Sequence, residues 1–159
     1  MSPKKTRDTR LFNLLKEKFI NLNVVGSDKT EVIAELVALA ATSKKIASKK
    51  SFFKAILERE ALGSTGIGNG VAIPHAKTKM ASDFILVFAR HTAGIDFGAL
   101  DGEKTYLFFM LASPPDKIGA HLKVLAEISR VVKDKFIVDR LKKAKDKKEI
   151  LRILSACKG

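Results

Sequence analysis

The chain has 159 residues, of which 46% are hydrophobic, and 30 lysines and arginines against 17 acidic residues give a formal net charge of +13. This length favours one domain, and no apolar run approaches the roughly 20 residues that a membrane-spanning helix needs. Cys157 is the single cysteine, which excludes an internal disulfide and a thiolate metal cluster. Because the charged N-terminus also lacks the apolar segment of a signal peptide, we expect a cytoplasmic protein.

The positive charge lies at the periphery of the sequence. Residues 1–20 carry +4, residues 44–54 carry +5 and residues 133–159 carry +6, so the rest of the chain sums to −2. Such charge fits either lysine-rich solvated helix faces or a binding face for nucleic acid, anionic lipid or an acidic protein. Because the sequence has no nucleic-acid recognition motif, we expect solvated faces and no stable nucleic-acid binding.

The beginning of the chain predicts a lead and a first strand. Residues 1–10 are expected to form a flexible basic lead, and residues 11–159 are expected to form the domain itself. Apolar residues between 11 and 20 recur at helical spacing, which predicts a short helical turn. The extended pattern of residues 22–25 then predicts the first strand near Leu22 to Val25.

Two helices are expected next. Asp28 is a candidate N-cap, and apolar residues at i, i+3 and i+4 predict an amphipathic helix from about Lys29 to Thr42. After a lysine-rich link, Ser51 is a second candidate N-cap, for a helix that ends near Arg59 or Glu60. Arg59 would then stand in the last turn, where the helix dipole stabilises a cation.

A glycine-rich stretch follows the second helix. A short strand, residues 71–73, comes after it, Pro74 ends that strand because it lacks an N–H, and His75 stands where the chain leaves it. Backbone N–H groups of such a loop can hold an anion, with an imidazole at the edge. Such stretches are also often only turns, and the Walker, dinucleotide and nucleophile-elbow motifs are absent. Four glycines fall within eight residues, namely Gly63, Gly66, Gly68 and Gly70.

The second half predicts buried strands and three helices. The apolar runs Phe84–Ala89 and Tyr106–Ala112 are typical of strands covered on both faces. Between them, the polar residues 90–92 are expected to end the first strand, Gly94 to turn the chain, and residues 95–97 to form a short strand, whereas residues 77–79 form an earlier loop. Helices are expected to begin at Gly119, Asp134 and Asp146.

Helices and short strands therefore intermix over one domain. This pattern predicts the α/β class, with a mixed sheet covered by helices on both faces.

The run GSTGIGNGVAIPH, from Gly63 to His75, closely resembles the active-site region of the type-2 (fructose/mannitol-like) enzyme IIA domains of the bacterial phosphotransferase system. It is most similar to the nitrogen-regulatory branch, and a weaker resemblance extends over residues 11 to 157. The resemblance implies a sheet of about five strands with flanking helices. It also implies that His75 carries a phosphoryl group.

Two further residues gain a role from the resemblance. Arg59 occupies the place of an arginine that faces the phosphoryl site, although its position alone indicates only a helix-end cation. His121, within the run Gly119 to Leu122, matches a second histidine beside the phosphorylated one, although such a histidine alone is more often a surface residue. His91 has no such match, and we expect a structural role for it.

The chemistry of phosphoryl transfer fits these residue types. Imidazole is a nucleophile and a leaving group near neutral pH, and its second nitrogen must hold its proton against a fixed acceptor. The transition state is loose, so its equatorial oxygens need preorganised donors. The loop offers such donors, and we expect phosphate contacts from Ser64, Thr65, Gly66 and Gly68. Neither a metal nor a cofactor is expected.

The resemblance implies protein partners. A histidine-containing phosphocarrier protein would be the donor, and a IIB domain or a regulated potassium-transport or sensor protein would be the acceptor or target. Similarity to the nitrogen-regulatory branch favours regulation over sugar uptake. Three alternatives stay open: a sugar-transport IIA component, a binding module for an acidic protein in which phosphorylation is only a switch or is lost, and a nucleic-acid binder.

Overall fold

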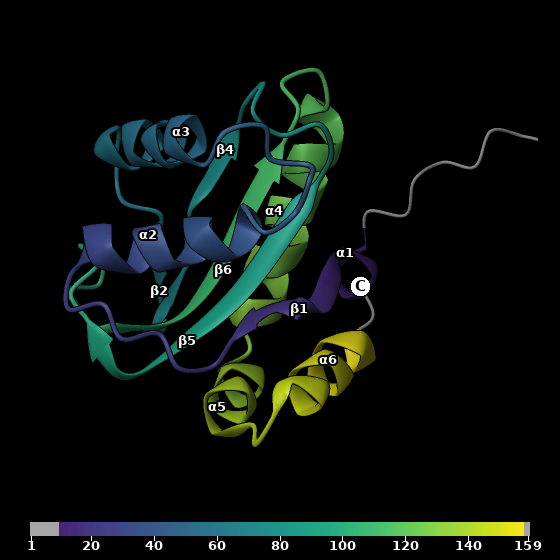
Figure 1. Ribbon diagram of the computed structural model, residues 1–159. Helices are drawn as coiled ribbons and strands as arrows, with labels where there is room; N and C mark the ends of the chain where they lie inside the picture. Colours follow the sequence, from purple (N-terminus) through teal and green to yellow (C-terminus); the bar gives the residue numbers. More distant parts are fainter. Residues whose placement is uncertain (1–9, 158–159) are drawn as a thin grey trace, which may run out of the picture.

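The computed structural model describes residues 10–157, which form one α/β domain with helices on both faces of a mixed sheet (Figure 1). Residues 1–9 of the predicted lead lie outside the described residues. Within residues 10–157, no helix combines the length and apolar character needed to cross a bilayer. The elements are α1 (Leu11–Leu14), β1 (Leu15–Asn21), α2 (Lys29–Ala40), α3 (Lys49–Ala61), β2 (Gly66–Gly68), β3 (Val71–Ala72), β4 (His75–Lys77), β5 (Ile85–Ile95), β6 (Thr105–Ser113), α4 (Ile118–Val132), α5 (Lys135–Lys143) and α6 (Lys147–Ala156).

The sheet is mixed, as the sequence predicts. Its strand order is β1-β5-β6-β3-β2, and β4 pairs with β6 beyond the end of β3. The central pair β5 and β6 is antiparallel, whereas β1 is parallel to β5 and both β3 and β4 are parallel to β6. The chain therefore leaves β3, passes Pro74 and continues along the same side of β6 as β4.

Each face of the sheet has its own apolar layer, and alternation along β6 shows why. Leu107, Phe109 and Leu111 pack into the layer under α1, α4, α5 and α6, and the residues between them pack into the layer under α2 and α3. All these side chains are buried. The prediction of helices on both faces of a sheet of about five strands is confirmed.

The helix starts follow from side-chain caps. Asp28 accepts a hydrogen bond from the backbone N–H of Glu31 at 2.8 Å, and Asp134 and Asp146 cap α5 and α6 in the same way. The predicted cap of α3 is wrong by one turn. Ser48 is the cap, and Ser51 is the residue whose N–H donates to the Ser48 Oγ at 3.2 Å.

The first strand lies earlier than predicted. The pairing of β1 with β5 shifts register between Leu15 and Ile20, and the residues 16–18 within this irregularity are exposed. Helix α1 confirms the predicted helical turn at residues 11–14. The bulge in β1 breaks the alternation of a strand and leaves buried residues at helix-like spacing, so the helical pattern continues over residues that belong to β1. Residues 22–25 are not a strand, although the N–H of Val24 still donates to the Arg90 carbonyl at 3.0 Å.

Two further strand limits differ from the predictions. Strand β5 does not end at residues 90–92 but continues to Ile95, which pairs with Thr105 after a register shift. Gly94 lies inside it with a φ of +77°, and a Cβ there would lie 2.6 Å from the Tyr106 ring. Residues 75–77, partly predicted as a loop, form β4. In both places tertiary pairing outweighs polar local sequence.

Candidate functional site

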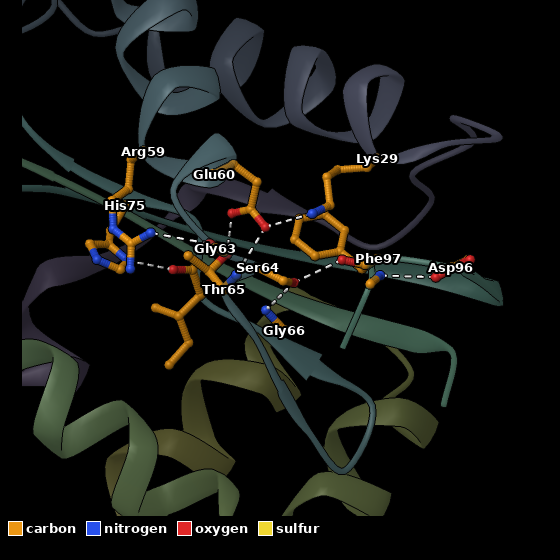
Figure 2. Close-up of polar contacts among 12 residues, drawn as sticks. Lys29, Arg59, Glu60, Gly63, Ser64, Thr65, Gly66, His75, Asp96 and Phe97 are labelled. Carbon is orange, nitrogen blue, oxygen red and sulfur yellow. Dashed lines mark hydrogen bonds and ion pairs between the residues drawn. The ribbon is translucent and has the colours of Figure 1, made fainter. Parts of the chain in front are cut away.

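His75 is the first residue of β4 and stands at a break in the sheet's edge. Pro74 cannot donate to the ladder, but its carbonyl accepts from the N–H of Leu111 at 3.0 Å, so the chain stays paired with β6 through the break. The Nδ1 atom of half-buried His75 lies 2.7 Å from the carbonyl oxygen of Ile73 (Figure 2). A carbonyl only accepts, so Nδ1 carries the proton and Nε2 keeps its lone pair.

Arg59 and His121 join His75 around one cavity of about 540 Å³. Arg59 comes from the last turn of α3, and its Nη1 donates to the Gly63 carbonyl at 3.1 Å. Figure 2 shows its side chain extending from the helix toward the His75 ring. The cavity is lined by α3, β4 and α4 through Ala55, Glu58, Arg59, Leu62, His75, Ala76, Lys77, His121, Leu122 and Leu125.

His121 is buried at the end of the first turn of α4, and its ring centroid lies 5.6 Å from that of His75. Its Nδ1 lies 2.6 Å from the hydroxyl oxygen of Ser113, the last residue of β6. Its Nε2 has no hydrogen-bond partner among the described residues. A buried polar atom without a partner is rare and points to an absent ligand or to a functional role.

The electrostatics keep both rings neutral near pH 7. Burial lowers the pKa of His121 to about 4, and the nearby His75 and Lys77 act in the same direction. Burial also lowers the pKa of His75; the bond to Ile73 opposes this shift, and the charge of Arg59 adds to it. A neutral imidazole is the form with a lone pair for attack on phosphorus.

The loop residues that are predicted to contact phosphate do not line the cavity. Both the N–H and the hydroxyl of Thr65 donate to the buried carboxylate of Glu60, at 2.9 Å and 2.6 Å. The hydroxyl of Ser64 donates to the Phe97 carbonyl at 2.8 Å and accepts from the N–H of Gly66 at 3.0 Å (Figure 2). Neither side chain lines the cavity.

The glycines of the loop form a hairpin. Gly66 and Gly68 belong to β2, which pairs with β3 in antiparallel fashion. Gly68 has a φ of +93°, and a Cβ there would lie 3.0 Å from the Asp101 carboxylate, so close approach explains this glycine. The phosphate contacts predicted for Ser64, Thr65, Gly66 and Gly68 stay predictions, whereas the structure brings His75, Arg59 and His121 together.

The sequence analysis missed three residues around the site, namely Glu60, Lys29 and Ser113. Glu60 is only 6% exposed and binds Lys29 at 2.8 Å in addition to Thr65. The spacing of Phe52, Ile56 and Glu60 would have placed this carboxylate on the buried face of its helix. Ser113, the third, carried no signal beyond its place at the end of an apolar run.

His91 bonds two backbone segments. Its Nε2 lies 2.9 Å from the Gly26 carbonyl, and its Nδ1 accepts from the N–H of Gly94 at 3.0 Å. This geometry agrees with a structural role. The described residues contain no group of three or more histidine, cysteine or acidic side chains placed to hold a metal ion.

Comparison with known proteins connects this geometry to a family. Residues 13–157 match the family described as "Phosphoenolpyruvate-dependent sugar phosphotransferase system, EIIA 2". A nitrogen regulatory protein of Bradyrhizobium diazoefficiens is 36% identical over 129 residues, which are 81% of this chain and 84% of that protein. The PTS system fructose-specific EIIABC component of Bacillus subtilis is 34% identical over 146 residues, 92% of this chain but 23% of that longer protein.

Solved structures share the fold. The nitrogen regulatory protein IIA-Ntr of Neisseria meningitidis superposes with a TM-score of 0.85 at 30% identity, covering 91% of this chain and 98% of that one. Mannitol enzyme IIA of Escherichia coli, in its complex with phosphorylated IIB, gives a TM-score of 0.78 at 21% identity and covers 89% of this chain and 97% of that one.

Proposed function

The chain belongs to the EIIA type 2 family of the phosphoenolpyruvate-dependent phosphotransferase system, and on that premise we propose that it is a phosphocarrier that is phosphorylated on His75. The observation that supports this proposal most directly is the 2.7 Å contact between His75 Nδ1 and the Ile73 carbonyl, beside Arg59 and His121 in one cavity. Because Nδ1 holds its proton in this contact, Nε2 is the nitrogen with a free lone pair and acts as the nucleophile. The donor is the phosphohistidine of a histidine-containing phosphocarrier protein.

The transfer step balances with these groups. The Nε2 lone pair forms a bond to phosphorus, and the bond between phosphorus and the donor's ring nitrogen breaks, with its electron pair returning to that ring. His75 keeps its Nδ1 proton, and the positive charge that its ring gains is stabilised by the Ile73 carbonyl. The step therefore needs no external proton and no oxidant or reductant.

Arg59 supplies the electrostatic stabilisation. The transition state is loose and spreads charge over three phosphoryl oxygens. The bond from Arg59 Nη1 to Gly63 steadies the side chain, and a guanidinium has further N–H groups in a planar fork that suits two of those oxygens. His121 adds a neutral ring on the other side of the cavity.

Exposed apolar side chains around the cavity support a protein partner. Leu62 and Leu122 line the cavity and are 84% and 57% exposed, and Ile118, at the start of α4, is 51% exposed. Apolar side chains at the rim of a reactive site suit a docking protein. We propose that a IIB domain or a regulated protein receives the group or reads it, because the E. coli mannitol domain forms a complex with phosphorylated IIB.

Regulation is the proposed purpose. The Bradyrhizobium and Neisseria relatives bear nitrogen-regulatory names and are matched over most of their length. A potassium-transport or sensor protein as the target is part of this proposal.

Reconstitution tests the proposal. The chain is incubated with phosphoenolpyruvate, enzyme I and the phosphocarrier protein, and its intact mass is measured. We expect a gain of one phosphoryl group in a linkage that is labile in acid and stable in base. An unchanged mass beside a phosphorylated donor would contradict the proposal.

A further inference from the structure

We infer that Ser113 is a positioning residue: its hydroxyl holds His121 in the tautomer that carries the proton on Nε2, so that His121 presents an N–H to the phosphoryl group on His75. This inference deepens the proposed function and rests on it for the identity of the acceptor. The tautomer itself does not depend on phosphorylation, so it is tested separately.

The position of Ser113 is unusual for a hydroxyl. Along β6 the residues Leu107, Phe109 and Leu111 form an apolar series toward the layer that contains α4, and Ser113 continues this series by the two-residue period of a strand. Its exposed fraction is 0%. A buried hydroxyl is unfavourable unless it is hydrogen-bonded, and its partner here is His121 Nδ1, at 2.6 Å.

The proton positions follow from the partners. If Ser113 donates to Nδ1, its hydroxyl proton is satisfied and the neutral ring carries its single proton on Nε2. If Nδ1 donated instead, the buried Ser113 proton would need another acceptor, and the structure shows none for it among the described residues. The first arrangement leaves one group unsatisfied, the Nε2–H of His121. The second leaves two.

That remaining donor lies where an acceptor is expected. His121 lines the cavity with His75, and the two ring centroids are 5.6 Å apart. Phosphoryl oxygens accept hydrogen bonds and cannot satisfy a bare ring nitrogen. The Nε2–H tautomer therefore gains a partner when His75 is phosphorylated, whereas the Nδ1–H tautomer would place a lone pair against the phosphoryl oxygens. Ser113 selects the first of these.

Nitrogen NMR of histidine-labelled protein tests the tautomer directly. In the wild type we expect His121 to show a protonated Nε2 and an unprotonated, hydrogen-bonded Nδ1. In Ser113→Ala we expect both tautomers, because the acceptor bond to Nδ1 is gone. Thr105→Val is the matched control: Thr105 is also buried, at the other end of β6, and its hydroxyl has no partner among the described residues.

Phosphorylation provides the second readout. In Ser113→Ala we expect the equilibrium between phosphorylated His75 and the phosphocarrier protein to move toward the carrier by about tenfold, the size of one hydrogen bond. Thr105→Val should behave as the wild type, and Ser113→Cys, which keeps a weak donor, should fall between them.

The outcomes separate the two proposals. A wild-type His121 with its proton on Nδ1 overturns the inference, even if Ser113→Ala fails to fold. An unchanged tautomer together with an unchanged equilibrium in Ser113→Ala also overturns it. A wild type that takes no phosphoryl group from a competent donor overturns the proposed function and leaves the tautomer measurement as the test of Ser113.

Discussion

The glycine-rich hairpin and the His75 cavity are neighbours in the sequence, but of the two only the cavity holds a buried side-chain atom without a hydrogen-bond partner among the described residues. In the hairpin, the hydroxyls of Ser64 and Thr65 and the N–H of Gly66 are all bonded within the protein. In the cavity, the buried Nε2 of His121 has no partner among the described residues. A cradle for an anion needs donors that are still available, so this difference favours the cavity over the hairpin.

The hydrogen bonds at the start of the hairpin connect secondary-structure elements. Glu60 follows Arg59 in α3 and joins that helix to Thr65 and, through Lys29, to α2. The glycines allow the chain to turn closely enough for these bonds and then to enter β3. The hairpin therefore connects α3 to β3 and β4, whereas the proposed transfer would take place in the cavity.

The strongest test of this division is removal of the nucleophile. His75→Ala should abolish phosphorylation while the circular dichroism spectrum stays that of the wild type, because His75 is only half-buried. His121→Ala should still be labelled, but more slowly. The measurement is the rate of label gain from the phosphocarrier protein. If His121→Ala took no label while His75→Ala did, the two histidines would be assigned the wrong way round.

Loss of Arg59 should have the next largest effect. Arg59→Ala should slow transfer by about 10²–10³, the usual cost of one donor to a developing anion. Arg59→Lys should recover little of this, because an ammonium group cannot make the bidentate contact of a guanidinium. Rates of label gain and loss are compared for both variants. Wild-type rates in Arg59→Ala would reduce Arg59 to a cation at a helix end.

The sequence predicted the helix starts and the central strands better than the bounds of the strands. Aspartates at three helix starts and the apolar run of β6 are local signals, and the structure follows them. Strand β1 was missed because charged residues 16–18 fall in an irregular pairing that only the fold explains. Pairing across the sheet likewise extends β5 to Ile95, beyond its polar residues.

Part of the candidate site could likewise be predicted from the sequence, and part could not. The glycine spacing and His75 are visible in one stretch of sequence, but Arg59 and His121 acquired a role only through the family resemblance. Glu60 could have been found from helical spacing. Ser113 could not, because its contact with His121 joins the end of a strand to a later helix.

Acid should lower the free energy of unfolding of the domain through the protonation of His121. The pKa of His121 is lowered to about 4 by burial, whereas an unfolded histidine titrates near 6.5. Between these values the unfolded chain binds a proton that the folded chain does not, so the free energy of unfolding falls as pH falls from about 6.5 to 4. The contribution of His121 is about 3 kcal/mol over this window.

Urea unfolding at several pH values measures this contribution. The difference between the wild type and His121→Gln isolates it, since glutamine does not titrate. The wild type should lose more stability than the variant between pH 6.5 and pH 4. Parallel stability curves for the two proteins would show that His121 is not responsible.

The smallest effect on phosphorylation should come from the hairpin, and Ser64→Ala is the sharpest form of this prediction. The Ser64 hydroxyl donates to the Phe97 carbonyl at 2.8 Å and accepts from Gly66, so it is already bonded. Its removal should lower the free energy of unfolding by about 1 kcal/mol and leave the rate of label gain within about threefold of the wild type, since the donors of the cavity are untouched.

If Ser64 instead contacts the phosphoryl group, as the loop sequence suggests, the rate should fall by about 10² or more, as for other oxyanion donors, while the stability hardly changes. The ratio of the two effects in one variant therefore decides whether the hairpin holds the site together or takes part in the transfer.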